Sequence, residues 1–163
     1  MKYDKKKFKN AVLYLAKHGG SNVGKKKLAK LLYLVDFTIY ELRKKSLTGI
    51  DYTKQSYGPM PEPKTFYSAL DELKKTKVID IKEPNDNHLE KIVPIKDPEM
   101  KVFDKQEKEI LNEITQKYRL DNGGDLERLA QSEPPYKMVE YGEKIPYYLA
   151  FYRNSFGEMD LDG

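Results

Sequence analysis

The chain has 163 residues and a formal net charge of +4, with 39% hydrophobic residues, 34% charged residues and no cysteine. These values exclude a wholly disordered chain, disulfide bonds and cysteine zinc sites, and they suit one domain that buries about 70% of its unfolded surface. The longest apolar run, residues 28–42, is interrupted by charged residues and no signal-peptide pattern opens the chain, so we expect a cytoplasmic protein without a membrane span.

Two helices are predicted in the first third of the chain. Apolar residues recur at helical spacing over residues 8–16, and Gly19 and Gly20 are expected to end this first helix. A second helix begins near Lys25, and its apolar stripe over residues 28–42 is wider than one contact face requires. The second helix is therefore predicted to be the buried centre of the fold.

The middle of the chain changes character twice. Residues 46–63 are predicted to form an ordered loop, because three prolines near its end forbid helix continuation. Helical spacing resumes over residues 64–76, which predicts a third helix. Two short extended runs, residues 78–83 and 88–95, then flank a Pro-Asn-Asp-Asn turn and predict a β-hairpin.

Two further helices are predicted before the C-terminal segment. Asp104 and Glu107 form a D-x-x-E capping pair ahead of one, and the other begins near Leu126. Beyond them the chain is again helical, with breaks at its prolines, and the acidic residues from about 157 to 163 are expected to fray. The prediction is a mainly α fold, a single compact helical domain over residues 1–163 with a small antiparallel β-hairpin.

The sequence contains no convincing catalytic or metal-binding motif. Residues 19–25 match the phosphate-loop pattern G-x-x-x-x-G-K, but a helix precedes them and Lys26 stands where magnesium binding needs a hydroxyl. The two histidines, His18 and His88, have no ligand-like or triad-like spacing around them. We therefore expect no enzymatic activity, no cofactor and no bound metal.

Tyrosines, one methionine and one acidic residue are the candidates for contact with a partner protein. The chain has 13 tyrosines, a residue type that interfaces favour because it offers wide apolar contact at low entropic cost. An ionised carboxylate in the apolar second helix is costly, so it either caps a backbone group or meets a lysine, or it contacts a partner. The candidate partner-binding residues are Asp36, together with side chains expected to be exposed on the proline loop and, if it folds beside that loop, on the C-terminal block: Tyr52, Tyr57, Met60, Tyr136 and Tyr147.

Nucleic-acid binding is the alternative. Residues 1–54 hold 14 Lys/Arg against 4 Asp/Glu, and Lys25, Lys26 and Lys27 could meet phosphates at a helix start. Three helices followed by a hairpin is also the order of a winged-helix domain. The third helix, however, carries no arginine or asparagine suited to base edges. A lysine-rich solvated surface is the simpler interpretation of the basic half.

Several blocks together resemble one family. The stretch KLAKLLYLVD at residues 27–36 is followed at the expected spacing by a Leu-Thr-Gly turn, a tyrosine and a Tyr-Gly-Pro segment. Near the C-terminus, LAQSEPPYK at residues 129–137 and Ile-Pro-Tyr at 145–147 complete the pattern. These blocks look like those of SocA-like Panacea domains. The second block departs from the usual Thr-His and Pro-Trp pairs, with Ala130-Gln131 and Pro135-Tyr136 in their places.

The resemblance implies a binding function. It implies an antitoxin of a bacterial or phage-associated toxin–antitoxin system that neutralises a cognate toxin, usually encoded by a neighbouring gene, by direct binding. Some relatives also deliver the toxin to a protease. The resemblance implies no enzymatic activity and no cofactor, and it leaves the toxin unidentified because such domains serve unrelated toxins.

Overall fold

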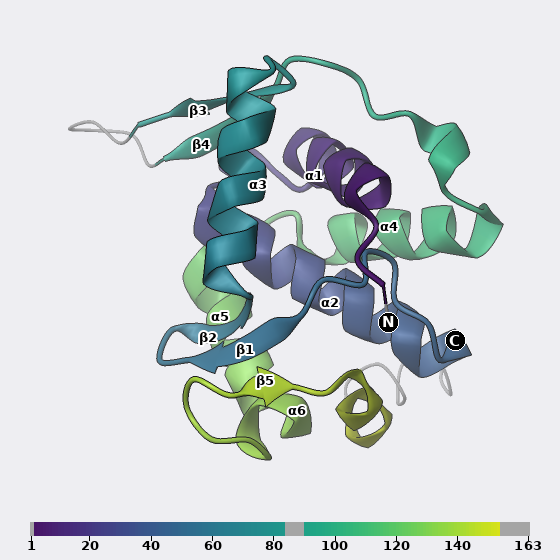
Figure 1. Ribbon diagram of the computed structural model, residues 1–163, viewed down its shortest axis with the longest axis vertical. Coiled ribbons are helices and arrows are strands. Elements are labelled where there is room, and N and C mark those ends of the chain that lie inside the picture. The colour runs from purple at the N-terminus through teal and green to yellow at the C-terminus, as the bar shows by residue number, and fades with distance from the viewer. Residues whose placement is uncertain (1, 84–89, 154–163) are drawn as a thin grey trace.

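The fold is organised around α2 (Lys25–Arg43), which runs through the middle of the molecule (Figure 1). The computed structural model describes residues 2–83 and 90–153. All side chains of α2 from Lys27 to Ile39 are buried, because neighbouring elements cover it on every side. The prediction that the second helix forms the centre of the fold is confirmed.

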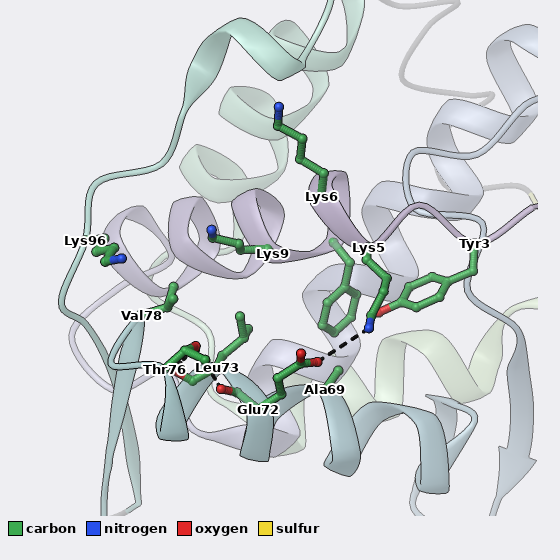
Figure 2. A pocket seen from close by; sticks show the side chains of 11 residues that line it. Tyr3, Lys5, Lys6, Lys9, Ala69, Glu72, Leu73, Thr76, Val78 and Lys96 are labelled. Atoms are coloured by element: carbon green, nitrogen blue, oxygen red, sulfur yellow. Dashed lines mark hydrogen bonds and ion pairs between the residues drawn. The ribbon is translucent and has the colours of Figure 1, made fainter.

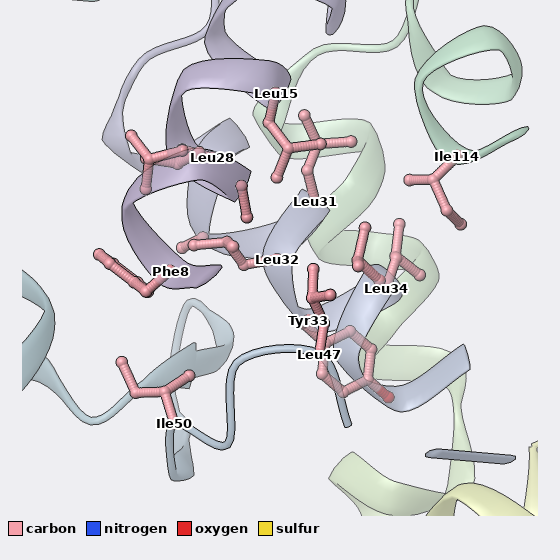
Figure 3. Close-up of a cluster of buried hydrophobic side chains, with 14 of the residues drawn as sticks. Phe8, Leu15, Leu28, Leu31, Leu32, Tyr33, Leu34, Leu47, Ile50 and Ile114 are labelled. Carbon is pink, nitrogen blue, oxygen red and sulfur yellow. The ribbon is translucent and has the colours of Figure 1, made fainter. Parts of the chain in front are cut away.

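Three helices pack against α2: α1 (Lys5–His18), α4 (Lys105–Tyr118) and α5 (Gly123–Ser132). Their apolar faces meet those of α2 in a core that includes Phe8, Leu28 and Ile114 (Figure 3). The predicted capping box of α4 is present, since Asp104 and Glu107 each accept a hydrogen bond from the other's backbone N–H. The P-loop-like pattern is the end of α1 and the start of α2, as predicted.

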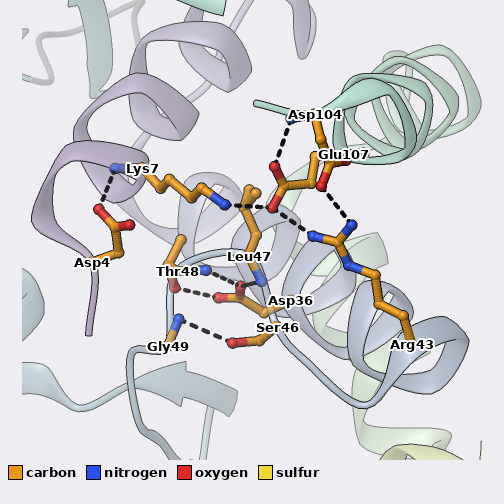
Figure 4. A network of polar contacts seen from close by, with 10 residues as sticks. All are labelled: Asp4, Lys7, Asp36, Arg43, Ser46, Leu47, Thr48, Gly49, Asp104 and Glu107. Carbon is orange, nitrogen blue, oxygen red and sulfur yellow. Dashed lines mark hydrogen bonds and ion pairs between the residues drawn. The ribbon is translucent and has the colours of Figure 1, made fainter. Parts of the chain in front are cut away.

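A buried carboxylate ties three of these helices together. Glu107 of α4 is fully buried, and its Oε2 lies 2.8 Å from Lys7 Nζ of α1 and 2.7 Å from Arg43 Nη2 of α2 (Figure 4). Arg43 also contacts Asp104 at 2.7 Å. Two cations therefore offset the cost of enclosing this charge.

The predicted third helix and β-hairpin are confirmed. Helix α3 (Pro63–Lys75) is followed by strands β3 (Ile79–Lys82) and β4 (Lys91–Pro94), which pair antiparallel. Buried and exposed residues alternate along β3, as expected for a strand with one face on the core. His88 and the expected turn of the hairpin lie outside the described residues.

The prediction of a loop over residues 46–63 is wrong for its second half. Strands β1 (Tyr52–Gln55) and β2 (Gly58–Pro61) form an antiparallel hairpin, and β5 (Lys144–Ile145) adds to β1 in the order β2-β1-β5. The prolines excluded a helix correctly, but they do not exclude an edge strand. Pro59 and Pro61 are two residues apart on the edge strand β2, where a missing N–H can face away from the partner strand.

The C-terminal block is only partly helical. It comprises α6 (Pro134–Lys137), β5 and the 3-10 helix η2 (Tyr147–Tyr152), and another 3-10 helix, η1 (Met100–Val102), precedes α4. The breaks fall at the prolines, as predicted, whereas β5 was not predicted. The residues expected to fray, about 157–163, lie outside the described part of the chain. Within the described part, every helix is too short or too polar to cross a membrane.

Candidate functional site

Asp36 organises the turn that leads from α2 into the β1–β2 hairpin. Its carboxylate accepts hydrogen bonds from the backbone N–H groups of Leu47 and Thr48 at 2.9 and 2.8 Å and from the Thr48 hydroxyl at 2.6 Å (Figure 4). It also accepts a hydrogen bond from the Tyr52 hydroxyl at 2.6 Å. Burial raises the pKa of Asp36 to about 6, although these hydrogen bonds favour the ionised form. The predicted capping role is confirmed. The carboxylate is completely enclosed, so the expectation that Asp36 is accessible to a partner is wrong.

Lys30 fixes the same hairpin from the other side. Its side chain is fully buried, and Nζ donates to the Pro59 carbonyl at 2.9 Å and lies 5.5 Å from the centre of the Tyr57 ring. Burial lowers the pKa of Lys30 to about 8, while the charge of Glu127 opposes this effect. At Gly58, where φ is +102°, a Cβ would lie 3.1 Å from Lys30 Nζ, so glycine is required there.

A second buried ion pair attaches the C-terminal segment to α2. Arg153 Nε lies 3.2 Å from both carboxylate oxygens of Glu133, and Arg153 Nη1 donates to Thr38 Oγ1 of α2. Tyr33 of α2 donates to the same Glu133 carboxylate at 2.9 Å. These side chains are all buried, so the residues just before α6 and just after η2 are held on one helix.

The enclosed side chains that connect α2, the β1–β2 hairpin and the C-terminal block, among them Lys30, Asp36, Glu133 and Arg153, form what we call the buried frame. Most of the predicted partner-binding residues belong to it. Tyr52 and Met60 are 0% and 3% exposed, and Tyr136 and Tyr147 are 6% and 8% exposed, so the expectation that they are exposed is wrong for these four. The hydroxyls of Tyr136 and Tyr147 donate to the carbonyls of Gln55 and Ile50. The C-terminal block therefore folds beside the hairpin, which was the condition for including Tyr136 and Tyr147 among the candidates. Tyr57, at the hairpin tip, is 39% exposed.

Other exposed apolar side chains surround this frame. Those on the C-terminal block were not chosen from the sequence as partner-binding candidates, although the abundance of tyrosine there pointed to them. Together with Tyr57 at the hairpin tip, they are the set of exposed residues that we call the aromatic surface: Tyr57, Met138, Tyr141, Tyr148, Phe151 and Tyr152. Lys54 Nζ lies 4.4 Å from the ring centre of Tyr136 and 4.7 Å from that of Tyr141, which orders the hairpin side of this surface.

The three lysines proposed for phosphate contact all have partners within the protein. Lys25 Nζ lies 3.4 Å from Glu90, and Lys26 Nζ lies 2.9 Å from Glu127. Lys27 is 5% exposed, and its ammonium group donates to the Arg119 carbonyl at 3.1 Å. This engagement weakens the nucleic-acid alternative, because a phosphate would have to displace intramolecular contacts.

Among the described residues, the histidine and acidic side chains form no cluster that could hold a metal ion. Within residues 2–83 and 90–153, no three or more histidine, aspartate or glutamate side chains are grouped closely enough to hold a metal ion. His18 is exposed at the end of α1, where its ring lies 4.6 Å from the ring of Tyr14. His18 is therefore a surface side chain at the turn that follows α1.

Comparison with known protein families shows which family the chain belongs to. The model of the family described as "Antitoxin SocA-like, Panacea domain" matches residues 28–137, which is more than half of the chain. The chain therefore belongs to this family, and the resemblance seen in the sequence is confirmed. The match begins within α2 and ends with α6, so α1 lies outside it. No curated protein and no solved structure matches the chain.

Proposed function

We propose that this protein is a cytoplasmic antitoxin that neutralises a cognate protein toxin by direct binding, without catalysis and without a cofactor. Its membership of the SocA-like antitoxin family carries this proposal. The toxin is the product of a neighbouring gene, and delivery of the bound toxin to a protease is a second route to the same result.

The aromatic surface is the part of the molecule best suited to hold the toxin. Tyr141, Tyr148 and Tyr152 are each more than half exposed, although aromatic side chains of this size are usually covered. Such side chains make strong anchors when their backbone is already rigid, because little entropy is lost on binding. Here the buried frame supplies this rigidity through Glu133, Arg153 and the β1–β5 pairing.

Co-expression tests the proposed function. The neighbouring reading frame is expressed alone and together with this chain, and growth and co-purification are scored. We expect a toxic neighbour, rescue of growth by the chain, and recovery of a complex. A harmless neighbour, or toxicity that the chain does not relieve, would contradict the antitoxin function.

Matched tyrosine variants then test the surface. We expect Tyr57→Ala with Tyr141→Ala to weaken toxin binding at least about tenfold, since central aromatic anchors each contribute more than about 1 kcal/mol. Tyr67→Ala is the control, because Tyr67 is 42% exposed but lies on α3. Equal affinity for both variants, with folding intact by circular dichroism, would mean that the toxin binds a different surface of the protein, even if the chain still rescues growth.

Proteolytic delivery has a separate readout. The half-life of the toxin is measured in cells with and without the chain after protein synthesis is stopped. A half-life shortened by the chain would support delivery, and an unchanged half-life together with growth rescue would support inhibition by binding alone.

A further inference from the structure

A groove runs between α1 and α3, at the end of the molecule away from β5 and α6 (Figure 1). It consists of two adjoining hollows of about 470 and 330 Å³, which share Tyr3, Lys5, Ala69 and Glu72 in their lining. Figure 2 shows the larger hollow, with side chains of α1 on one wall and side chains of α3 on the other. Two adjoining hollows that open onto each other suit a segment of chain better than a compact small molecule.

The base of the groove is apolar. Phe8, Leu73 and Val78 line the larger hollow, and each is less than a tenth exposed. Ala69 lines both hollows and is partly buried against the core. An occupant would therefore need apolar side chains to fill the base, which a phosphodiester backbone does not provide.

The rim of the groove is strongly positive. Five lysines line the two hollows, whereas Glu72 is the one acidic residue among the described residues that line them. The lysines are Lys5, Lys6, Lys9, Lys64 and Lys96. Opposite charges at the rim steer and orient a partner, so the groove favours an occupant with a row of carboxylates.

Two details of the rim allow a ligand carboxylate to enter. The Lys5–Glu72 pair bridges the groove at 3.5 Å, and both side chains are more than half exposed, so this contact is weak and can be exchanged (Figure 2). Burial and the charge of Glu72 raise the pKa of Tyr3 to about 12, so its hydroxyl stays protonated and can donate a hydrogen bond.

We propose that this groove binds an acidic peptide segment of a partner protein, with apolar side chains on the base and carboxylates on the lysine rim. This site goes beyond the proposed function, since it lies apart from the aromatic surface and its test requires no toxin. The occupant is defined by chemistry: an elongated segment in which Asp or Glu alternates with aliphatic residues.

Fluorescence anisotropy with defined peptides tests the proposal on the full chain. The probe is a labelled peptide of about 12 residues that combines Glu with Leu at regular spacing, and the comparison peptide has Gln in place of Glu. We expect the Glu peptide to bind at least about tenfold more tightly and to weaken as salt rises, because the rim charges are exposed to solvent. Equal affinity for the two peptides would overturn the proposal.

A matched pair of variants tests the location of the site. Lys5→Glu with Lys9→Glu reverses two rim charges, whereas Lys105→Glu with Lys108→Glu makes the same change in net charge on exposed positions of α4. We expect about a tenfold loss of peptide affinity for the first variant and less than about a twofold loss for the second. Equal losses would show attraction by net charge alone and would overturn the site.

Two further measurements test the apolar base of the groove and the chemical class of its occupant. Ala69→Trp fills the base without changing charge, so it should also weaken the Glu peptide, provided that thermal unfolding shows an intact fold. A short DNA duplex that displaces the peptide and binds more tightly than it would overturn the peptide assignment in favour of nucleic acid. Failure of these tests would leave the growth-rescue result for the antitoxin function unaffected.

Discussion

The two ends of the molecule use charged residues in opposite ways. Around α2, the β1–β2 hairpin and the C-terminal block, charges are enclosed and hydrogen-bonded, as at Asp36, Lys30 and Arg153. Along the groove between α1 and α3, lysines such as Lys5 remain at the surface and the Lys5–Glu72 pair is open to solvent, although Lys7 of α1 contacts the buried Glu107. The first end has a fixed internal structure, whereas the second presents charge to a partner.

The family match covers part of each of these two ends. The matched range, residues 28–137, contains Lys30, Asp36 and Glu133, and α1 with its lysines lies outside it. Helix α3, one wall of the groove, also lies inside the matched range, whereas Arg153 of the enclosed end lies outside it. Specificity for a partner must come from exposed side chains, because buried ones cannot distinguish one protein surface from another.

The largest effect is expected at Asp36. Asp36→Ala removes the acceptor of four hydrogen bonds and leaves buried donors at Leu47, Thr48 and Tyr52 without it. We expect the free energy of unfolding to fall by about 3–5 kcal/mol, measured by chemical denaturation. Glu109→Ala, at an exposed position of α4, should change it by less than about 0.5 kcal/mol. A loss below about 1 kcal/mol for Asp36→Ala would show that the frame does not depend on this carboxylate.

The Glu133–Arg153 pair should show strong coupling. Arg153→Met leaves a buried carboxylate without its cation, and we expect a loss of about 3 kcal/mol in the free energy of unfolding. Adding Glu133→Gln removes the unbalanced charge, so the double variant should lose less than the sum of the single losses. Additive losses in the double-mutant cycle would contradict a role for the charge pair.

The stability that Lys30 contributes to the enclosed end should depend on pH. Burial lowers its pKa from the usual lysine value of 10.5 to about 8 in the folded state, so between these values the unfolded chain binds more protons and stability rises with pH. Between about pH 7 and 9.5 the wild type should gain about 2 kcal/mol in unfolding free energy relative to Lys30→Met. The nearby charges of Glu127 and Lys26 are present in both proteins and cancel in this difference. A constant difference across this range would contradict the enclosed ammonium group.

Sequence reasoning located the helices well because their signals are local. Apolar spacing and the capping pair at Asp104 and Glu107 predicted helices that the structure contains. The strand β5 could not be predicted, since it has two residues and depends on pairing with β1, which lies about 90 positions earlier in the chain. The β1–β2 hairpin was not predicted because closely spaced prolines indicate a loop, although an edge strand tolerates them.

The candidate site shows the same limit. Asp36 was recognised because a carboxylate in an apolar helix needs a partner, and Lys30 in the same helix carried an equal but unused signal. For Tyr52, Tyr136 and Tyr147 the sequence specifies only residue type, and burial was decided by contacts between distant segments. Tyrosine serves equally as a buried hydrogen-bond donor and as an exposed anchor, so composition alone does not separate these roles.

The smallest effect is expected at the groove. Lys5→Gln removes an exposed ion pair that is screened by solvent, so the free energy of unfolding should change by less than about 0.5 kcal/mol. Arg43→Gln is the matched change at the enclosed end, because Arg43 meets the fully buried Glu107 at 2.7 Å, and it should cost about 2 kcal/mol or more. Both values are measured by denaturation in low salt and again in high salt, which should abolish the Lys5 effect and largely preserve that of Arg43. Similar losses at the two positions would mean that the lysine rim stabilises the fold. Its charges would then not be available to bind a partner.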